Sequence, residues 1–456
     1  MGFLLVAFGV AFAASAFAHL TLYRWALRSF PALGRARLAL AVALALLFLW
    51  PLGRALGRTG SLPGPVRAVA QLGSTWHLFV FLAMALYGLG LLAAAGVRRA
   101  SRLAASPPSL APTEGSRELD SPSPAPTEGS RGRGSASPAP TEGSREPGSP
   151  SPASTEGSRE PGSASPAPVA RVGAPAVRLS RRRFVEAAGG VGALATSAGV
   201  LGWGLRVSRF DWQVEEVPVR LPRLPRVLDG FTIVQISDLH VGPLWREREL
   251  RQGLSFVASL RPDLVVVTGD IIDHDRRYVP LAARLLGSLS AREGVAFVPG
   301  NHDHYAGARE VVAGLSSAGL EALVNRGKVI APGDGGGFAL LGVDDIVGDR
   351  RGLGPDLDRA LASTPEGLAT VLLAHQPDFF YRTLRRGGVD VQLSGHTHGG
   401  QINPGFVPAS FVYQFVAGLY ERPGGRLYVN RGFGTVGPPM RVGAPPEITK
   451  LVLLAG

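Results

Sequence analysis

Cysteine is absent from the 456-residue sequence, and lysine is rare beside arginine. The lack of cysteine excludes disulfide bonds, thiolate metal sites and a cysteine nucleophile, although it does not indicate the redox state of the compartment. Any metal ion must therefore be bound through oxygen and imidazole ligands.

The arginines are not clustered in the way that is typical of nucleic-acid-binding proteins. The formal net charge is +12, from 47 Lys and Arg against 35 Asp and Glu. Much of the arginine stands beside apolar segments, where positive charge sets the orientation of membrane helices. We therefore expect a membrane partner and no nucleic-acid partner.

Charged residues are almost missing from long stretches of the first hundred positions. Residues 2–23 and 71–97 are each long enough to cross a bilayer, which requires about 20 apolar residues. Residues 38–53 are shorter and contain Pro51, so they form either a short third span or a re-entrant segment, and we favour a span. We expect a transmembrane region over residues 1–100.

Large apolar side chains are nearly missing from residues 101–177, which are rich in Ser, Pro and Gly. A 14-residue repeat is visible as APTEGSR beginning at Ala111, Ala125 and Ala139. Stacking such repeats would bury too little apolar surface to offset the loss of backbone entropy. We predict a disordered linker rather than a solenoid.

Residues 178–205 combine a basic flank with an uncharged stretch rich in Ala and Gly. The segment Ser180–Phe184 resembles a twin-arginine export signal, and its arginines are equally typical of the cytoplasmic end of a membrane helix. Both interpretations place the chain after Leu205 outside the cytoplasm. We expect a multi-pass cell-membrane protein of three or four spans, although Arg54, Arg58 and Arg67 make the charge bias weak.

After residue 228 the pattern changes to short runs rich in β-branched residues that alternate with polar, helix-compatible stretches. Such runs indicate the buried strands of an α/β domain extending over residues 228–456. In these domains, sites form beyond the carboxyl ends of strands. The predicted strands are 231–236, 264–267, 295–298, 338–343, 371–373 and 389–393.

Potential metal ligands follow five of these six strands. Alternation in an extended segment would let Asp238 and His240 face one ion while Leu239 enters the core. A tight turn at Gly395 would divide the two following imidazoles between two ions. Asp270 is the natural bridge between the ions. The side chains are Asp238, His240, Asp270, Asn301, His302, His375, His396 and His398.

Each fragment alone is more typical of a turn than of a ligand, but their order after successive strands predicts a dinuclear metal site. These blocks resemble the calcineurin-like metallophosphoesterase family across residues 231–456. They read Asp238-Leu239-His240, Gly269-Asp270, Gly300-Asn301-His302-Asp303, His375 and Gly395-His396-Thr397-His398.

The resemblance implies a fold, a ligand set and a catalytic residue. The fold would be two packed β-sheets flanked by helices, preceded here by transmembrane helices. His302 would contact the substrate phosphate and protonate the leaving oxygen. One metal would be held by Asp238, His240, Asp270 and His398, and the other by Asp270, Asn301, His375 and His396.

A narrower resemblance links the chain to a membrane-associated bacterial branch similar to twin-arginine-exported phosphodiesterases. It depends on Gly399-Gly400-Gln401-Ile402-Asn403-Pro404 and on Asn430-Arg431-Gly432-Phe433-Gly434. The N-terminal apolar segments and the linker depart from a simple exported form. They favour a permanent anchor with an extracytoplasmic catalytic domain.

We therefore expect a membrane-anchored phosphodiesterase or phosphatase that uses metal-activated water. Its two divalent ions would be Mn, Fe or Zn, since the ligand set does not choose among them. The alternatives are a lipid-linked pyrophosphate hydrolase and a non-catalytic metal-binding module, the latter expected to lack ligands.

Several further residues have two interpretations from the sequence. Arg431 and Arg441 are either phosphate or rim contacts, or ordinary surface or turn arginines. Gln376 and Thr397 are candidates for contacts behind the ligands. The aromatic stretch 406–420, with Phe411, Tyr413, Phe415 and Tyr420, forms either an apolar groove beside the metals or part of the core.

Overall fold

The structure is a computed structural model that describes residues 2–45, 64–104, 180–333, 335–351, 354–403 and 409–456. Residues 95–179 form a separate unit, of which only the end of one helix lies within the described residues. The predicted linker 101–177 and the second half of the predicted span 38–53 therefore lie largely outside the described residues. The account below concerns residues 2–94 and 180–456.

Long helices make up the N-terminal part of the described chain. The predicted spans 2–23 and 71–97 fall within α1 and α3. Among the described helices, two segments are long and apolar enough to cross a membrane, Trp76–Val97 and Arg181–Phe210. The helices are α1 (Gly2–Ser29), the 3-10 helix η1 (Pro31–Ala36), α3 (Gly64–Ala104) and α4 (Arg181–Arg206).

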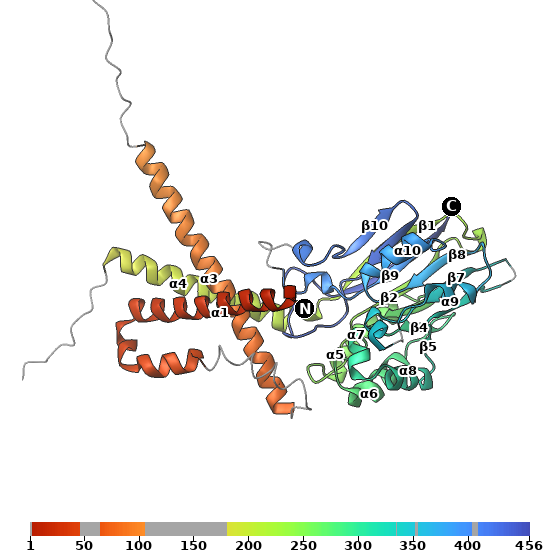
Figure 1. Cartoon of the computed structure of the whole chain (residues 1–456), viewed down its shortest axis with the longest axis horizontal. Helices are drawn as coiled ribbons and strands as arrows, with labels where there is room; N and C mark the ends of the chain where they lie inside the picture. Colours follow the sequence, from red (N-terminus) through yellow and green to blue (C-terminus); the bar gives the residue numbers. More distant parts are fainter. Residues whose placement is uncertain (1, 46–63, 105–179, 334, 352–353, 404–408) are drawn as a thin grey trace, which may run out of the picture. The chain divides into compact units, whose positions relative to one another are not determined.

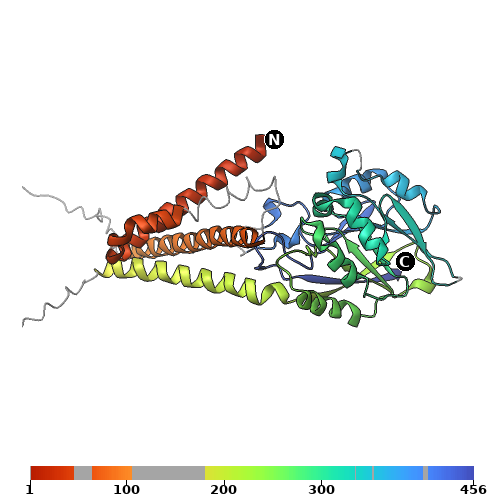
Figure 2. The same ribbon diagram turned by 90° about the horizontal axis from the view of Figure 1, so that it is seen from below.

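Helix α4 begins within the basic flank, with Arg181–Arg183 in its first turn, and continues directly into the globular domain (Figure 2). The side chain of Ser180 accepts the backbone N–H of Arg183 and so caps the helix. The indole N–H of Trp25 in α1 donates to the carbonyl of Glu186 at 3.2 Å. A Cβ at Gly190 would lie 2.1 Å from the Trp25 ring, so α1 and α4 can approach this closely only at a glycine.

Two six-stranded sheets form the frame of the globular domain (Figure 1). The first has the order β1-β12-β2-β3-β4-β5 and the second β10-β11-β9-β8-β7-β6. The strands of the first are β1 (Gln213–Leu221), β2 (Phe231–Ile236), β3 (Leu264–Thr268), β4 (Val295–Val298), β5 (Glu321–Ala322) and β12 (Glu447–Ala455). Those of the second are β6 (Arg326–Ile330), β7 (Phe338–Gly342), β8 (Ala369–Leu373), β9 (Val391–Ser394), β10 (Gly418–Arg422) and β11 (Gly425–Val429).

The first sheet begins earlier in the chain than the predicted domain start at residue 228. Strand β1 pairs in parallel with β12 over nine residues, from Gln213 with Glu447 to Leu221 with Ala455. Strand β1 alternates between exposed and partly buried positions, so it lacks the continuous apolar run that marked the other strands. Its pairing partner lies at the far end of the chain, and no local pattern reveals it.

Apolar side chains form three layers around the two sheets. Val234, Val265 and Phe297 pack outward against the helices on the first sheet. Ile233 and Val266 point the opposite way and pack between the sheets, as the two-residue period of a strand requires. Helix α9 covers the outer face of the second sheet. The prediction of two packed sheets flanked by helices is confirmed.

The covering helices are short and amphipathic. Helices α5, α6 and α8 contribute buried apolar residues to the layer on the first sheet, whereas α9 and α10 lie beside the second. The helices of the domain are α5 (Glu247–Ser259), α6 (Val279–Leu286), α7 (Asn301–Ala306), α8 (Ala308–Ser317), α9 (Leu357–Ala362) and α10 (Phe380–Arg386).

Candidate metal centre

The predicted ligands come from the carboxyl ends of strands in both sheets. Asp238, Asp270 and Asn301 follow β2, β3 and β4 of the first sheet, while His375 and His396 follow β8 and β9 of the second. Packing of the two sheets therefore brings together side chains that are far apart in the sequence.

A first donor group consists of Asp238, His240 and His398, whose ligand atoms all lie within 4.8 Å of one another. The Nε2 atom of His398 is 3.3 Å from Asp238 Oδ1 and 3.0 Å from His240 Nε2. All three residues are buried. Two imidazole nitrogens and a carboxylate thus converge on one point, as in a metal site.

A second donor group consists of Asp270, His375 and His396. Asp270 Oδ2 lies 3.3 Å from His375 Nε2, and His375 Nε2 lies 3.3 Å from His396 Nδ1. The same Asp270 oxygen is also 3.6 Å from His240 Nε2 in the first group. Asp270 therefore lies between the two groups, where a bridging carboxylate would be required.

Asn301 adds an amide oxygen next to the second group. Its Oδ1 atom is buried and has no hydrogen-bond partner among the described residues. A buried acceptor without a partner is costly, so an unpaired amide oxygen beside a carboxylate fits a cation ligand. The backbone on both sides of Asn301 lies against Asp270, since a Cβ at Gly300 would be 2.3 Å from Asp270 Oδ1 and the backbone N–H of His302 donates to that oxygen at 2.8 Å.

The charges of the site also fit cations. Burial would raise the pKa of Asp238, but the charge and hydrogen bond of His398 hold that pKa below its ordinary value. Burial lowers the pKa of His240 to about 3 and that of His396 to about 4, which leaves both imidazoles neutral. Ionised carboxylates and neutral imidazoles are the protonation states in which these side chains bind metals. His375 differs: burial would lower its pKa, but the charge and hydrogen bond of Asp270 raise it well above its ordinary value, so this imidazole would release a proton when an ion binds.

Five ligand candidates have a left-handed backbone conformation, which corrects the expectation of an extended segment. The φ angles of Asp238, His240, Asp270, His396 and His398 are 54°, 48°, 51°, 74° and 53°. Asp238 and His240 thus reach one point from a turn beyond β2, although Leu239 is buried as expected. Positive φ in residues other than glycine is strained, and such strain is concentrated at functional sites.

The role of Gly395 also differs from the expected tight turn. Its φ is not positive, and the positive values fall on the histidines that follow. A Cβ at Gly395 would lie 1.9 Å from Ser237 Oγ and 2.3 Å from Asp238 Oδ2. Glycine is required there because the loop after β9 passes directly against the loop after β2.

His302 lies beside the donor groups and is oriented by Asp273, a residue that the sequence did not single out. The Nδ1 atom of His302 is 2.8 Å from the carbonyl oxygen of Asp273 and 3.4 Å from its Oδ1. Donation of the Nδ1 proton to this carbonyl leaves Nε2 free to face a substrate. The motif Gly269-Asp270-Ile271-Ile272-Asp273 places the second carboxylate three residues after the first, and this spacing was the available clue.

Asp303 connects the loops that carry Asp270 and Asn301. Its carboxylate accepts the backbone N–H groups of Gly300, Ile271 and Ile272 at 2.9 to 3.2 Å. Burial, together with the charge of Asp270, raises the pKa of Asp303 to about 6. Asp303 therefore stabilises the backbone conformation of the Gly300-Asn301-His302-Asp303 block.

Arg441 is fully buried, so its interpretation as a surface arginine is wrong. Its side chain is fully buried and donates to backbone carbonyls of the loops around the first donor group. The partners include the carbonyls of Gly432 at 2.9 Å, Arg431 at 2.8 Å and His398 at 3.3 Å. The guanidinium therefore holds the loop after His398 against the loop that precedes β12.

The other three candidates have identifiable partners. Arg431 pairs with Glu215 at 2.6 Å and with the buried Glu447 at 3.2 Å, so it connects the loop between β11 and β12 to β1 and to the first residue of β12. Gln376 donates to both carboxylate oxygens of Asp345, at 2.8 and 3.0 Å, directly after the ligand candidate His375. Thr397 donates its hydroxyl to the carbonyl of Val416 at 2.5 Å.

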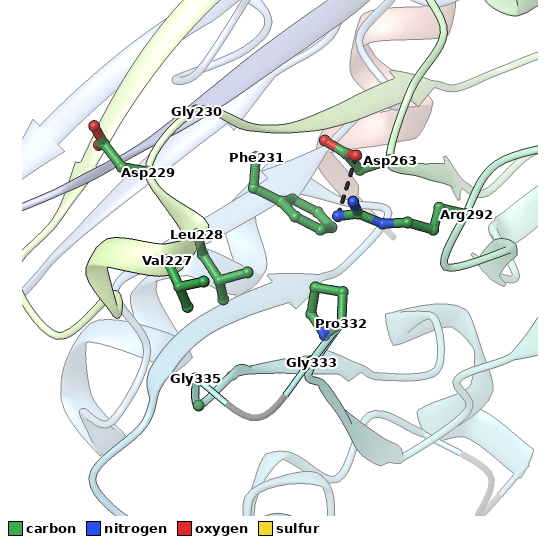
Figure 3. Close-up of a pocket in the computed structure, with 11 residues that line it drawn as sticks. Val227, Leu228, Asp229, Gly230, Phe231, Asp263, Arg292, Pro332, Gly333 and Gly335 are labelled. Atoms are coloured by element: carbon green, nitrogen blue, oxygen red, sulfur yellow. Dashed lines mark ion pairs between the residues drawn. The ribbon is translucent and has the colours of Figure 1, made fainter.

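A pocket of about 340 Å³ lies away from these groups (Figure 3). It is bordered by Gly230 and Phe231 at the start of β2 and by Asp263, which precedes β3, whereas the donor groups follow the ends of these strands. Its one lining cation, Arg292, is paired with Asp263 at 3.2 Å. The pocket therefore belongs to the opposite edge of the first sheet and takes no part in the metal centre.

Comparison with known proteins agrees with this geometry. Residues 231–400 match the sequence pattern of the calcineurin-like phosphoesterase family. The metallophosphoesterase YkuE of Bacillus subtilis is 34% identical over 288 residues, which are 60% of this chain and 98% of that protein.

Two vertebrate proteins are similar as well, and both are described as transmembrane proteins with a metallophosphoesterase domain. The protein of Bos taurus is 38% identical, with 53% of this chain and 56% of that protein covered. The protein of Danio rerio is 36% identical, with 60% of this chain and 66% of that protein covered. The match spans only part of the length of these two relatives. The chain belongs to the calcineurin-like phosphoesterase family and is a phosphoester hydrolase.

Proposed function

We propose that this protein is a membrane-anchored hydrolase, a phosphodiesterase or phosphatase, in which two divalent metal ions activate a water molecule. The observation that carries the proposal is the position of Asp270, whose Oδ2 atom lies within 3.6 Å of a histidine from each donor group. A carboxylate between two neighbouring sets of buried ligands is the arrangement that a dinuclear centre requires.

Seven side chains would hold the two ions. Bound there, the ions would lower the pKa of a water molecule and neutralise charge on the phosphate oxygens. Ligands of this type suit Mn, Fe or Zn. The first ion would be bound by Asp238, His240, Asp270 and His398, and the second by Asp270, Asn301, His375 and His396.

His302 would act as the catalytic acid. Its Nδ1 proton is committed to the carbonyl of Asp273, so the proton given to the leaving oxygen would come from Nε2. Burial would lower the pKa of His302, but hydrogen bonding and charge from Asp273 and Asp270 raise it above the ordinary value. The raised pKa favours the protonated form of His302, which this role requires.

The membrane part of the proposal places several helices in the bilayer and the catalytic domain on the extracytoplasmic side. It is supported by the two apolar helices of the described chain and by the basic flank at Arg181–Arg183, which would remain in the cytoplasm. Similarity to proteins described as transmembrane agrees with an anchor.

A second candidate function is hydrolysis of a lipid-linked pyrophosphate. It is favoured by Phe411 and Val412, two strongly exposed apolar residues in the segment that leads to Tyr413 beside His396. A non-catalytic metal-binding module is disfavoured, because all seven ligand candidates and His302 are present.

Hydrolysis by the purified full-length chain tests the proposal. We expect release of aryl alcohol from an aryl phosphodiester or an aryl phosphomonoester in the presence of Mn, and loss of this turnover in His396→Ala. The ratio of the two rates ranks the ester classes. A folded chain that contains two metal ions per molecule and cleaves neither ester would contradict the general phosphoesterase proposal and leave the lipid-linked candidate.

A further inference from the structure

Phe411 and Val412 are the most exposed large apolar residues of the described chain, at 79% and 77%. They lie at the end of the 3-10 helix η9 (Ala409–Phe411) and directly after it. Residues 409–417 contain no charged side chain. Two adjacent apolar side chains that are almost fully exposed indicate a surface that is covered by a partner in the working protein.

The aromatic stretch is divided: Phe415 belongs to the core, whereas Phe411 lies on the surface, so neither sequence interpretation describes the whole stretch. Phe415 is 2% exposed and packs with Phe380, Leu427 and Val429, while Tyr420 packs against this cluster. The Tyr420 hydroxyl accepts the backbone N–H of Val416 at 2.8 Å. The segment is therefore anchored in the second sheet on one side and presents Phe411 and Val412 on the other.

The same segment borders the candidate metal centre. The Tyr413 ring lies 6.4 Å from the ring of His396, at 84° to it. Thr397, between the two histidines of the last ligand block, donates to Val416 at 2.5 Å. Val412 is thus adjacent in the chain to Tyr413, whose ring lies beside His396 of the second donor group.

In the other direction the segment is connected to the apolar helices. A Cβ at Gly400 would lie 2.6 Å from the Cβ of Ala409, so η9 packs against the turn that follows His398. Two residues farther along this turn, Ile402 packs against an apolar cluster that consists of Leu82 of α3, Leu201 of α4, and Met440 and Val442 of the domain. The turn is therefore connected to the apolar helices through this cluster, and it also supplies a metal ligand candidate at His398.

The contact with α4 is at the end of its apolar stretch. Met440 and Val442 of the domain pack with Leu201 and with Leu205, which immediately precedes Arg206. The backbone N–H of Arg441 also donates to the carbonyl of Gly204 at 3.2 Å. If α4 crosses the membrane, its last apolar turn marks the bilayer surface, and the turn carrying Ile402 lies at that level.

We propose that Phe411 and Val412 insert into the bilayer surface and that the metal centre acts on a phosphate ester carried by a membrane lipid. The insertion depends on the exposed apolar pair and its connection to α3 and α4. The substrate class additionally rests on the proposed function. In the reaction, the P–O bond to the lipid alcohol breaks, hydroxide from water bonds to phosphorus, and the lipid oxygen receives a proton.

Spin labelling tests the insertion independently of hydrolysis. The chain has no cysteine, so Val412→Cys provides a unique attachment site. Val227→Cys is a matched control, because Val227 is also an exposed valine, at 66%, and lines the pocket at the opposite sheet edge. Full-length chains in phosphatidylcholine nanodiscs would be exposed to oxygen, which concentrates in lipid, and to a water-soluble nickel chelate.

We expect the label at residue 412 to collide more with oxygen than with nickel, and the label at residue 227 to show the reverse. Equal nickel accessibility at both positions would overturn the insertion. A label at 412 that is shielded from both reagents would also overturn it, because that result indicates protein rather than lipid around the pair.

Phosphate release from dioleoyl phosphatidate and from glycerol 3-phosphate tests the substrate class. For the unmodified chain in nanodiscs we expect faster release from the lipid. The combined change Phe411→Ser and Val412→Ser should lower the ratio of lipid to soluble rates by about tenfold or more. Val227→Ser should leave the ratio unchanged.

The two proposals fail in different ways in this assay. A lipid rate in the unmodified chain that does not exceed the soluble rate, with both substrates cleaved, would overturn the lipid substrate and leave the phosphoesterase activity intact. An unchanged ratio in the double variant would overturn the role of Phe411 and Val412 in substrate access. Absence of hydrolysis of either substrate and of the aryl esters by the metal-loaded chain would overturn the proposed function, while the spin-label result would still decide the insertion.

Discussion

Buried carboxylates at the carboxyl ends of strands are the residues on which the centre depends most. Asp238 and Asp270 are 0% and 2% exposed, and their ligand atoms face histidines rather than lysine or arginine. A buried negative charge is stable only when it is paired or coordinated to a cation. Substitution of a ligand candidate and substitution of a neighbouring residue should therefore have different effects on metal content and on turnover.

We predict that Asp270→Ala loses both metal ions, because this carboxylate lies between the two donor groups. Asp378→Ala, at an exposed position in the 3-10 helix after β8, is the control and should keep the wild-type metal content. Elemental analysis of the purified proteins makes the comparison. Full occupancy in Asp270→Ala would show that the bridging assignment is wrong.

His302→Ala should keep both metals but lower kcat by about 10²- to 10⁴-fold, the usual contribution of a general acid. Asp273→Asn retains the backbone carbonyl that accepts His302 Nδ1, so we expect a smaller loss than in His302→Ala. Steady-state kinetics together with metal analysis separates the effects. A His302 variant that loses metal would contradict a purely acid role.

The pair formed by His304 and Asp344 predicts a pH-dependent stability. The hydrogen bond that Asp344 Oδ1 accepts from His304 Nε2, at 2.7 Å, raises the pKa of His304 above its ordinary value. The stabilisation is therefore complete below about pH 6.5, the pKa of an unfolded histidine, and is lost as the pH rises through the higher folded pKa.

The measurement is the difference in melting temperature between the wild type and Asp344→Asn. This difference should be largest at pH 5.5 to 6 and should decrease toward alkaline pH. A difference that grows with pH would contradict the assigned pairing.

At the scale of elements, the loop that precedes β12 connects helix α4 to the first donor group. The backbone N–H of Arg441 donates to the carbonyl of Gly204 in α4. The Arg441 side chain donates to the carbonyls of His398, Arg431 and Gly434. Gly434 in turn donates its backbone N–H to the carbonyl of Asp238 at 2.9 Å. Displacement of α4 should therefore be transmitted to the ligands of one metal.

Gly204→Ala tests this connection, because its Cβ would lie 2.6 Å from the carbonyl oxygen of Arg441. We expect a decrease of about 10- to 100-fold in affinity for one of the two metals, as for other changes that misorient ligands. Gly202→Ala is the control, since no atom lies within 4 Å of the added Cβ in the same helix. Metal titration should then distinguish the variants, and equal affinities would exclude the coupling.

At the scale of the whole molecule, the arrangement of anchor and domain predicts the side of the membrane on which each part lies. The basic residues before α4 should stay in the cytoplasm and the two-sheet domain should lie outside. Since the chain lacks cysteine, single cysteines can report each location without background.

Phe256→Cys, in α5 at 41% exposure, should react in intact cells with a membrane-impermeant maleimide, whereas Ser180→Cys should react only after permeabilisation. The physical basis is the cost of moving a basic flank across the bilayer. The opposite labelling pattern would place the active site in the cytoplasm and would disprove the orientation.

Much of the frame of this domain is visible in its sequence. The predicted strands 231–236 and 295–298 coincide with β2 and β4, because continuous β-branched runs bounded by turns are a local property. Strands β1, β5, β6, β10, β11 and β12 were not predicted. The pairing of β1 with β12 joins Gln213 with Glu447, which no local pattern can indicate.

By itself the sequence determined which chemical groups are available and in what order they follow the strands. Only the tertiary structure decided their arrangement, since His240 and His398 are 158 positions apart and meet because two sheets pack face to face. Packing also imposed the left-handed backbone of five ligand candidates, oriented His302 through Asp273, buried Arg441 and left Phe411 exposed. Local periodicity encodes a strand, whereas a site depends on contacts between segments that only the folded chain brings together.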